Sequence, residues 1–356
     1  MNKIREIIKK IVPIDKTSFL RTQEYLDNLT KPIGSLGKLE DLVKKIVAIT
    51  GKKKPVIKRK LVFVLAGDHG VTEEGISAYP SNVTAQMVHN FIHGGAGINV
   101  LSRYIGAEVI IVDIGVAEEL KQKSDKLKIK KIGYGTNNFV NGPAMTLTQA
   151  IKSVETGIKL VENELRSGID IIITGDMGIG NTTVSSAITS VITNKTVEEV
   201  TGKGTGITDT KLKHKIKVIE KAISVNNPNK SDPIDILHKI GGFEIGGLTG
   251  IILASAAYRI PIVLDGFIST TAGLLAFLFN HYIKDYLFAG HCSQEPGHKI
   301  QLEYLGLDPI LNLEMRLGEG TGAVLATCII EASCRLYNEM ATFDSAGVSK
   351  KLKDRH

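Results

Sequence analysis

Aromatic residues make up only 5% of this 356-residue chain, and tryptophan is absent. Surfaces that bind nucleic acid usually interleave basic side chains with aromatic rings on which bases stack. The chain does carry a net charge of +7, with basic clusters at 52–60 and 350–355, but it lacks such rings beside them. We interpret the clusters as solvated loops and expect no nucleic-acid partner, although a positive field also favours a small anionic substrate.

Cysteine is scarce as well. The chain has three, none in a C-x-x-C pair: Cys292, Cys328 and Cys334. A sparse, odd number of cysteines is typical of a protein kept in a reducing compartment, so we predict a cytoplasmic location.

Long uninterrupted apolar runs are also missing. The longest, at 251–264, is broken by Arg259 and Pro261, and residues 1–12 carry a charge in nearly every turn. A bilayer span needs about 20 consecutive apolar residues. We therefore expect no membrane segment and no signal peptide.

Short apolar runs that end at glycine are present instead. They are rich in β-branched residues and lie at 60–66, 108–113, 169–174 and 260–265. Continuous rather than alternating apolar runs predict strands that are buried on both faces, as in a parallel sheet. A helical pattern lies between two of them: Thr146 and Gln149 match a capping box, an apolar stripe runs from Ile151 to Leu165, and Gly168 follows.

Alternation of such strands and helices predicts an α/β protein with a doubly wound, mostly parallel, Rossmann-like sheet. We expect residues 55–320 to form the large catalytic domain. Residues 1–54 and 321–356 contain helical patterns without strands, so we expect them to pack together as a small helical domain. In such sheets ligands bind beyond the carboxyl ends of the strands, where the glycine loops fall.

Two glycine loops are suited to holding a phosphate. The loop 175–183 (GDMGIGNTT) follows a predicted strand and opens a helical pattern, although it matches neither the P-loop nor the dinucleotide fingerprint. A tight strand-to-helix turn explains it equally well. The loop 201–206 (TGKGTG) precedes a run of lysines, of which Lys215 can reach a phosphate while the others form a solvated helix face.

Other polar residues carry less specific signals. His291, Cys292 and His298 lack a fourth zinc ligand, and His89 and His93 lack the glutamate of a zinc-binding H-E-x-x-H pattern, so we predict no metal site. The latter two are expected to be surface or core histidines. The loop 67–75 contributes three acidic residues and a histidine to a strand end, either as acid–base machinery or as a polar loop that bonds to itself: Asp68, His69, Glu73 and Glu74.

Near the carboxyl end, Glu319 stands between Gly318 and Gly320 in the segment 315–322 (MRLGEGTG), and an apolar run follows. A carboxylate in a partly dry pocket can act as a general base because burial tunes its pKa. A carboxylate that merely favours a helix N-terminus is the simpler alternative.

Seven segments together resemble the nicotinate-nucleotide–dimethylbenzimidazole phosphoribosyltransferase family of cobalamin lower-ligand synthesis. They occur in family order from KPIGSLG at 31–37 through AGDHG at 66–70, 75–80, 175–183, GGFE at 241–244 and LDGF at 264–267 to 315–322. The resemblance implies that 5,6-dimethylbenzimidazole attacks the anomeric carbon of nicotinate mononucleotide, giving nicotinate and α-ribazole 5′-phosphate with inversion. It also implies a homodimer that needs no cofactor and no metal.

The resemblance further implies the roles of individual residues. Glu319 would be the general base, and Asp176, where well-studied members carry glutamate, a second catalytic carboxylate. Lys215 and Ser293 would hold the phosphate. The remaining substrate-binding positions are Tyr79, Gln86, Met87, Gly178, Gly180, Asn181, Thr182, Gly204 and Leu317.

Two departures from the family concern the acceptor base. Tyr79 stands where the best-known members have serine, and Met87 where they have glutamine. Dimethylbenzimidazole is the first expectation, with another benzimidazole, adenine or a phenolic base as alternatives. Two other functions stay open: a magnesium-dependent transfer from phosphoribosyl pyrophosphate, and a nucleotide-binding module that would tolerate loss of the Glu319 carboxylate.

Overall fold

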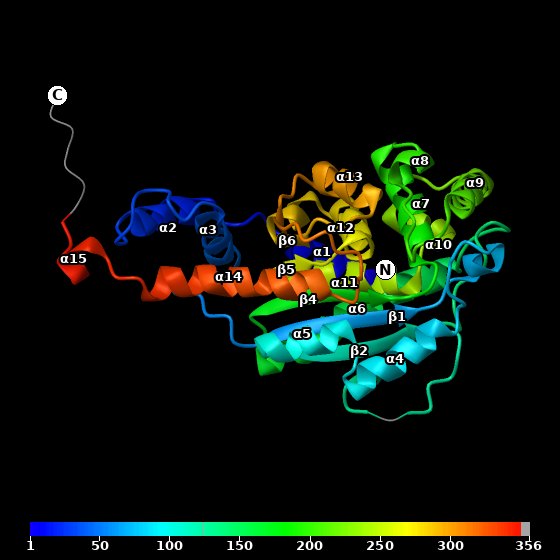
Figure 1. The fold of residues 1–356 in the computed structure, drawn as a ribbon, viewed down its shortest axis with the longest axis horizontal. Helices are drawn as coiled ribbons and strands as arrows, with labels where there is room; N and C mark the ends of the chain where they lie inside the picture. The colour runs from blue at the N-terminus through cyan, green and yellow to red at the C-terminus, as the bar shows by residue number, and fades with distance from the viewer. Residues whose placement is uncertain (123, 350–356) are drawn as a thin grey trace.

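A computed structural model describes residues 1–122 and 124–349 of the chain. Its centre is a seven-stranded sheet in the order β3-β2-β1-β4-β5-β6-β7, with every neighbouring pair parallel (Figure 1). The strands are β1 (Lys60–Gly67), β2 (Glu108–Gly115), β3 (Leu127–Ile129), β4 (Ile171–Met177), β5 (Ile262–Leu264), β6 (Leu287–His291) and β7 (Pro309–Leu311). The predicted doubly wound α/β fold is confirmed, and the winding reverses between β1 and β4.

The four predicted strands are present, with shifted ends. Every residue of β1 is buried, as the continuous apolar run indicated. We expected β4 to end at residue 174, but the strand continues through Gly175 and Asp176 to Met177 because it stays paired with β1, where Leu65 lies opposite Asp176. β5 starts only after Pro261, which has no N–H to give to a strand ladder.

Helices cover both faces of the sheet (Figure 1). On one face lie α4 (Val83–His93), α5 (Gly97–Ile105) and α14 (Thr321–Glu339). On the other lie α11 (Phe243–Ala257) and α12 (Phe267–Phe279), with α6 (Leu147–Glu164) packed against α11. A further group of helices packs together and contacts α12 through α7, α10 and α13: α7 (Asn181–Thr193), α8 (Val197–Val200), α9 (Asp209–Asn226), α10 (Pro233–Ile240) and α13 (Pro296–Leu305).

The capping box predicted for α6 is confirmed. Thr146 Oγ1 accepts a hydrogen bond from the Gln149 N–H at 3.2 Å, and the Gln149 side chain accepts one from the Thr146 N–H at 2.9 Å. The middle of the predicted apolar stripe is buried, whereas Ile151 and Leu165 at its two ends are only partly covered. A 3₁₀ turn (Leu165–Ser167) separates the helix from Gly168.

The chain ends meet beside α14. The helices α2 (Thr17–Asp27) and α3 (Lys38–Thr50) pack together, α3 lies along α14, and Leu29 forms a β-bridge with Thr342 just before α15 (Phe343–Ala346). By contrast, α1 (Asn2–Lys10) packs on α11 and α6. The division into a domain of 55–320 and a helical domain from 1–54 and 321–356 stays a prediction, and residues 350–356 lie outside the described part of the chain.

The first basic cluster is only partly solvated. Lys52, Lys53, Lys54 and Lys58 are exposed, but Lys60 is buried and forms an ion pair of 2.8 Å with Glu331. The second cluster, at 350–355, lies outside the described residues. Among the residues described, no helix combines the length and the apolar character that crossing a membrane requires.

Glycines allow α6 and α11 to approach each other closely. A Cβ atom at Gly157 would lie 1.9 Å from the carbonyl oxygen of Gly247, and one at Gly250 would lie 2.0 Å from that of Val154. Real Cβ atoms do not approach backbone oxygens so closely, so any larger residue must push the two helices apart. Because α11 covers the middle of the sheet, that displacement would reach the core.

We therefore expect Gly157→Ala to lower the free energy of unfolding by about 3 kcal/mol, as overpacking of a core contact does. Urea unfolding followed by circular dichroism would measure it. Lys159→Ala, at an exposed position of the same helix, is the control and should change stability little. Equal stability of the two variants would mean that the helix contact is not as tight as described.

Candidate active site

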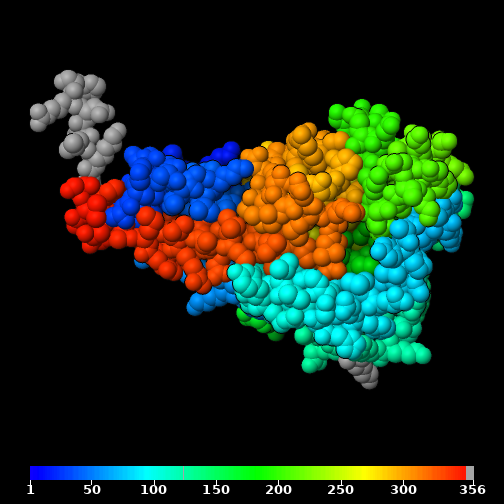
Figure 2. All heavy atoms as spheres, in the orientation of Figure 1, coloured from blue at the N-terminus to red at the C-terminus, as the bar shows by residue number. Residues whose placement is uncertain are grey.

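The polar residues of interest gather at the carboxyl ends of neighbouring strands. Asp68 and His69 follow β1, Asp176 is the next-to-last residue of β4, Asp265 follows β5, and His291 ends β6. These strands are adjacent in the sheet around the point where its winding reverses. On the face shown in Figure 2, a recess opens where segments coloured light blue, green and orange-red meet, the colours of the chain regions that hold the loops 67–80, 175–183 and 315–320.

Glu319 lies in a turn with an unusual backbone. Three successive residues have positive φ angles: 81° at Gly318, 64° at Glu319 and 100° at Gly320. Glycine adopts this left-handed region without a steric penalty, whereas other residues rarely do. The two glycines are therefore needed to bend the chain immediately before α14, and Glu319 shares their conformation. The turn also packs directly on β4, because a Cβ at Gly175 would lie 2.2 Å from the Glu319 carbonyl oxygen.

The Glu319 side chain is only 5% exposed. Its Oε2 atom accepts a hydrogen bond of 3.1 Å from the N–H of Ile98, in the first turn of α5. Burial raises the pKa of the carboxyl group, the Ile98 N–H opposes this, and the negative charge of Asp265 adds to the increase. A carboxylate with a raised pKa is a stronger base, so this group is suited to accepting a proton.

Asp176 faces the same turn. A Cβ at Gly318 would lie 3.6 Å from its Oδ2 atom, which also accepts a hydrogen bond of 3.0 Å from the Asn181 side chain. Burial raises the pKa of Asp176 well above its usual value, and the negative charges of Asp265, Glu244 and Glu319 raise it further. The site thus contains two buried carboxyl groups in different surroundings, which is how one site separates an acid from a base.

Asp265 is a third buried carboxylate, and it touches the Glu319 turn through its backbone. Oδ2 accepts a hydrogen bond of 3.1 Å from the Gly320 N–H, and Oδ1 accepts one of 3.0 Å from the Ala323 N–H. Burial raises the pKa of Asp265 to about 7, while these N–H groups act in the opposite direction. Nε2 of His291 lies 3.7 Å from Oδ1.

A second group of polar residues surrounds the buried ammonium group of Lys215 in α9, and we call it the Lys215 pocket. This lysine is 1% exposed, and its ammonium group donates to Thr182 Oγ1 at 2.9 Å and to the Gly202 carbonyl at 3.4 Å. Burial lowers the pKa of Lys215 to about 8, and the carboxylate of Glu295 opposes that decrease. Gly204 lies against the pair, since a Cβ there would be 2.8 Å from Thr182 Oγ1.

The start of α7 lies beside this pocket. Its N-cap is Gly180, with a φ of 99°, and Asn181 and Thr182 form its first turn. A helix N-terminus presents free N–H groups and favours negative charge. The buried ammonium group, the Thr182 hydroxyl and this helix end together can hold a phosphate. The structure therefore brings Gly180, Thr182, Gly204 and Lys215 together.

Ser293 joins the same region through Glu295. The Ser293 Oγ atom accepts a hydrogen bond of 3.3 Å from the Glu295 N–H, and Glu295 Oε1 accepts one of 2.9 Å from the Gly204 N–H. The Ser293 N–H donates to Nδ1 of the buried His298 at 2.9 Å. These contacts place Ser293 and Gly204 on two linked loops at the pocket.

The residues expected to face the acceptor base lie near the protein surface, at the rim of the candidate site. Tyr79 is 56% and Leu317 59% exposed, Gln86 is exposed, and Met87 is half-buried on α4. Leu317 contacts the start of α5, because a Cβ at Gly97 would lie 3.0 Å from its Cδ2. Within the described residues, no hydrogen bond joins Tyr79, Gln86 or Met87 to the Glu319 turn.

Contacts between loops connect this rim to the phosphate pocket. Thr205 Oγ1 accepts a hydrogen bond of 3.1 Å from the Ala78 N–H, next to Tyr79. Arg316, next to Leu317, donates to the Gly204 carbonyl at 3.1 Å. The loop 202–206 therefore touches both the predicted phosphate residues and the two segments that carry the predicted base residues.

The loop 67–75 divides into two parts. His69 and Glu244 are fully buried, with Nε2 and Oε1 3.0 Å apart but not aligned as an ordinary hydrogen bond. Burial acts to lower the pKa of His69, but the Glu244 carboxylate outweighs it and the net change is upward. The pair supports Gly178, where a Cβ would lie 3.2 Å from His69 Nε2. Glu74, nearer the surface, accepts a hydrogen bond from Asn138 instead.

Sequence reasoning assigned no role to Glu244, Asp265 or Glu295, although the first two lie in the quoted motifs. A signal was available for Asp265, because it is the last residue of a predicted strand, and Asp176 lies just beyond the end of another. No comparable signal marked Glu295. His93 is exposed, and its Nδ1 lies 2.7 Å from the His89 carbonyl oxygen. In the described chain, no three or more His, Cys, Asp or Glu side chains are grouped to hold a metal ion.

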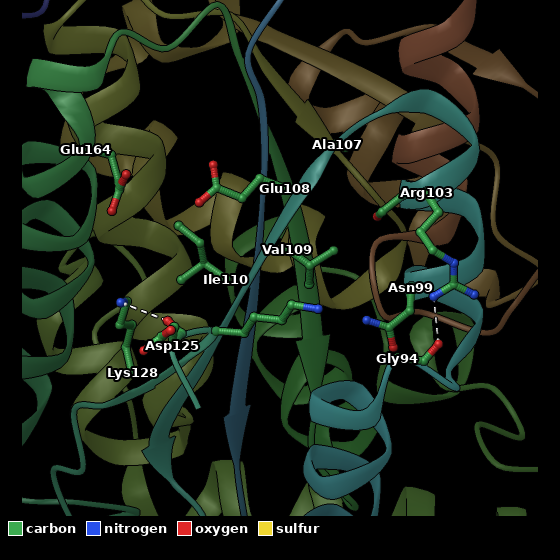
Figure 3. Close-up of a pocket in the computed structure, with 12 residues that line it drawn as sticks. Gly94, Asn99, Arg103, Ala107, Glu108, Val109, Ile110, Asp125, Lys128 and Glu164 are labelled. Atoms are coloured by element: carbon green, nitrogen blue, oxygen red, sulfur yellow. Dashed lines mark hydrogen bonds between the residues drawn. The ribbon is translucent and has the colours of Figure 1, made fainter. Parts of the chain in front are cut away.

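A hollow at the other end of the sheet is unrelated to these residues. It lies beside the start of β2, between Arg103 of α5 and Glu164 of α6, with Asp125 and Lys128 across it (Figure 3). None of the predicted site residues lines it. Proteins with this fold bind ligands beyond the carboxyl ends of the strands. We therefore place the candidate site at the Glu319 turn and the Lys215 pocket.

Comparison with known proteins gives a consistent result. A family model described as phosphoribosyltransferase matches residues 11–348. A protein from Desulforudis audaxviator named nicotinate-nucleotide–dimethylbenzimidazole phosphoribosyltransferase is 52% identical over 354 residues, covering 99% of this chain and 100% of its own. One of the same name from Geobacter sulfurreducens is 51% identical over 350 residues, covering 98% and 99%. The crystal structure of the Thermus thermophilus protein of that name, 40% identical, superposes with a TM-score of 0.89 over 95% of this chain and 100% of its own.

Proposed function

The chain belongs to the nicotinate-nucleotide–dimethylbenzimidazole phosphoribosyltransferase family, and on that premise we propose how its site performs the reaction. Ribose 5-phosphate passes from nicotinate mononucleotide to 5,6-dimethylbenzimidazole, and the products are α-ribazole 5′-phosphate and nicotinate. The observation that carries the proposal is the buried Glu319 carboxylate, presented at the carboxyl edge of the sheet in a chain that matches relatives of this name almost from end to end.

The general base of the proposed reaction is Glu319. One ring nitrogen of dimethylbenzimidazole attacks the anomeric carbon of the ribose, and the bond from that carbon to the nicotinate nitrogen breaks with its electron pair going to nicotinate. The other ring nitrogen of the base loses its proton to the Glu319 carboxylate. Nicotinate leaves from a pyridinium and needs no proton of its own. The raised pKa of Glu319 supports this role, because it increases the affinity of the carboxylate for the proton.

We assign the second carboxylate, Asp176, to the positive charge of the nucleotide. In the free protein, burial and its acidic neighbours favour the neutral form of Asp176. A bound pyridinium, and the charge that develops on the ribose as its bond breaks, favour the ionised form. The positive charge moves from the pyridinium to the ribose as the bond breaks, and a carboxylate that is already ionised beside the bound nucleotide stabilises it there and lowers the barrier.

The phosphate of the nucleotide is assigned to the Lys215 pocket. The contacts among Lys215, Thr182 and Gly204, the N-terminus of α7 and the link to Ser293 support this assignment. Gly178 and Asn181 lie in the chain between Asp176 and Thr182, and Asn181 donates to Asp176, so we assign both to the ribose. Tyr79, Gln86, Met87 and Leu317 are assigned to the acceptor base, for which the names of the relatives favour dimethylbenzimidazole over adenine or phenols.

Two further properties belong to the proposal. We infer a homodimer from the family resemblance. We infer a cytoplasmic location from the three cysteines, which form no disulfide in the structure.

The first test is chromatography of a reaction of the purified protein with nicotinate mononucleotide and dimethylbenzimidazole, without added metal. We expect nicotinate and α-ribazole 5′-phosphate to appear together. Absence of both, with turnover of phosphoribosyl pyrophosphate in the presence of magnesium, would overturn the proposal and support the other transfer reaction.

Glu319→Gln is expected to lower kcat by about 100- to 1,000-fold, because the amide keeps the shape of the side chain but cannot take the proton. The melting temperature should stay close to that of the wild type, since the amide oxygen can still accept from the Ile98 N–H. The matched control is Glu314→Gln, at an exposed glutamate five residues earlier in the chain that also has a positive φ, 55°. A kcat within a few-fold of the wild type for Glu319→Gln would exclude the residue as the base.

Lys215→Ala is expected to raise KM for nicotinate mononucleotide by about 10- to 100-fold, the effect of losing a charged hydrogen bond to phosphate. In the wild type, kcat/KM for the nucleotide should fall as the pH rises through about 8, because the amine is charged below its pKa and neutral above it. The variant should lack this decrease. Lys217→Ala, exposed on the same helix, is the control. An unchanged KM would remove Lys215 from the phosphate site.

A further inference from the structure

The carboxylate of Asp265 lies behind the Glu319 turn and is hydrogen-bonded to its backbone. Asp265 is 1% exposed and follows β5 directly. Its two oxygens accept from the N–H groups of Gly320 at 3.1 Å and Ala323 at 3.0 Å, and the Gly322 N–H also faces it. All three N–H groups come from the four residues that follow Glu319 in the chain.

These contacts make Asp265 a cap for the N-terminus of α14, although Asp265 follows β5 and is distant from α14 in the chain. The first N–H groups of a helix have no partner within it, and a Ser, Thr, Asp or Asn at the N-cap usually accepts from them. The N-cap of α14 is Gly320, which has no side chain and adopts a φ of 100°. A capping residue at this position would be forced into the left-handed region. This conformation and a Cβ position only 3.0 Å from the Thr174 carbonyl oxygen both favour glycine here, so the acceptor comes from elsewhere.

The same contacts restrain Glu319. A non-glycine residue in the left-handed region persists only where its surroundings hold it there. On the carbonyl side of Glu319, Gly175 leaves room for the peptide against β4, and on the side-chain side the Ile98 N–H binds the carboxylate. Asp265 holds the next peptide N–H, that of Gly320. If this hold is lost, the backbone of Glu319 is free to leave the left-handed region and the carboxylate moves away from Ile98.

We propose that Asp265 is a positioning residue: by capping α14 from β5 it holds the Glu319 turn in its left-handed conformation and so aims the Glu319 carboxylate at the acceptor base. Asp265 acts through Glu319 and need not touch either substrate. The proposal rests on the proposed function for its kinetic test, but its structural part can be tested without any reaction.

A double-mutant cycle tests the dependence on Glu319. Asp265→Asn keeps the size of the side chain but turns an NH₂ group toward one of the N–H donors. We expect kcat to fall about 10- to 100-fold while KM for nicotinate mononucleotide changes less than about threefold, because the Lys215 pocket is not touched. Added to Glu319→Gln, the same change should lower kcat by less than about threefold more, since residues that act as a unit are not additive. If the kcat decreases of the two single variants multiply in the double variant, the proposal is overturned and Asp265 acts independently of Glu319.

Amide hydrogen exchange tests the structural part. In Asp265→Asn we expect faster exchange at Gly320, Gly322 and Ala323, with the amides of β1 and β4 unchanged. Unchanged exchange at all three positions would overturn the proposal even if activity fell. If Asp265→Asn does not fold, Asp265→Ser removes the charge without facing an NH₂ group toward the donors and allows the same measurements.

The matched control is Asp232→Ala, because an asparagine amide oxygen could replace the one carboxylate oxygen that caps this helix. Asp232 caps α10 in the ordinary way, with Oδ1 accepting from the N–H groups of Ile234 at 2.9 Å and Asp235 at 3.2 Å. Loss of this cap should alter stability but leave kcat as it is. A similar loss of kcat in both variants would show that any lost cap has this effect and would overturn the specific role of Asp265. Failure of the wild type to turn over the two substrates would count against the proposed function, while the exchange result would still decide the role of Asp265.

Discussion

The candidate site depends on keeping several carboxyl groups buried side by side. Glu319, Asp176, Asp265 and Glu244 are all less than 7% exposed and gather at one edge of the sheet. Desolvation and mutual repulsion both oppose such an arrangement. The structure offsets this mainly with peptide N–H groups, from the first turn of α5 to Glu319 and from the first turn of α14 to Asp265, and with the His69 imidazole beside Glu244. Helix starts at the carboxyl edge of a parallel sheet supply these N–H groups without any cation.

The two halves of the site each bury one ionisable group, an amine in one half and carboxyl groups in the other. Around Lys215, burial disfavours the charged amine, and around Glu319 burial disfavours the charged carboxylate. The proposed substrates bring a partner to each group. The phosphate brings negative charge to Lys215, the pyridinium brings positive charge to the carboxylates, and the ring N–H of the acceptor base can donate to Glu319. The loop 202–206 connects both halves, through Glu295 on one side and Thr205 and Arg316 on the other.

The sequence allowed the sheet and the α6 capping box to be predicted, because both rest on local signals: β-branched runs and a four-residue cap. The glycines around Glu319 marked its segment, and the structure places that segment at the carboxyl ends of β4 and β5, while its catalytic role stays a prediction. The length of β4 could not be predicted, since Asp176 stays in the strand only through its pairing with β1. The buried His69–Glu244 pair joins residues that are 175 positions apart in the chain, and no local pattern marks such a contact. The hydrogen bonds from the α14 backbone to Asp265 could not be predicted either. Their donors are main-chain N–H groups, which every residue except proline has, so no side-chain pattern in the sequence indicates them.

The position of α14 in the chain has a consequence for biosynthesis. The groups that satisfy Asp265 belong to residues 320–323, whereas β5, which carries it, is complete by Leu264. As the ribosome releases the chain from its N-terminus, the sheet can assemble through β6 while this carboxylate still needs water. Burial of the Asp265 carboxylate therefore has to wait until α14 has been synthesised. In a nascent chain that ends before Gly320, this carboxylate has no N–H groups of α14 to bind and stays in contact with water.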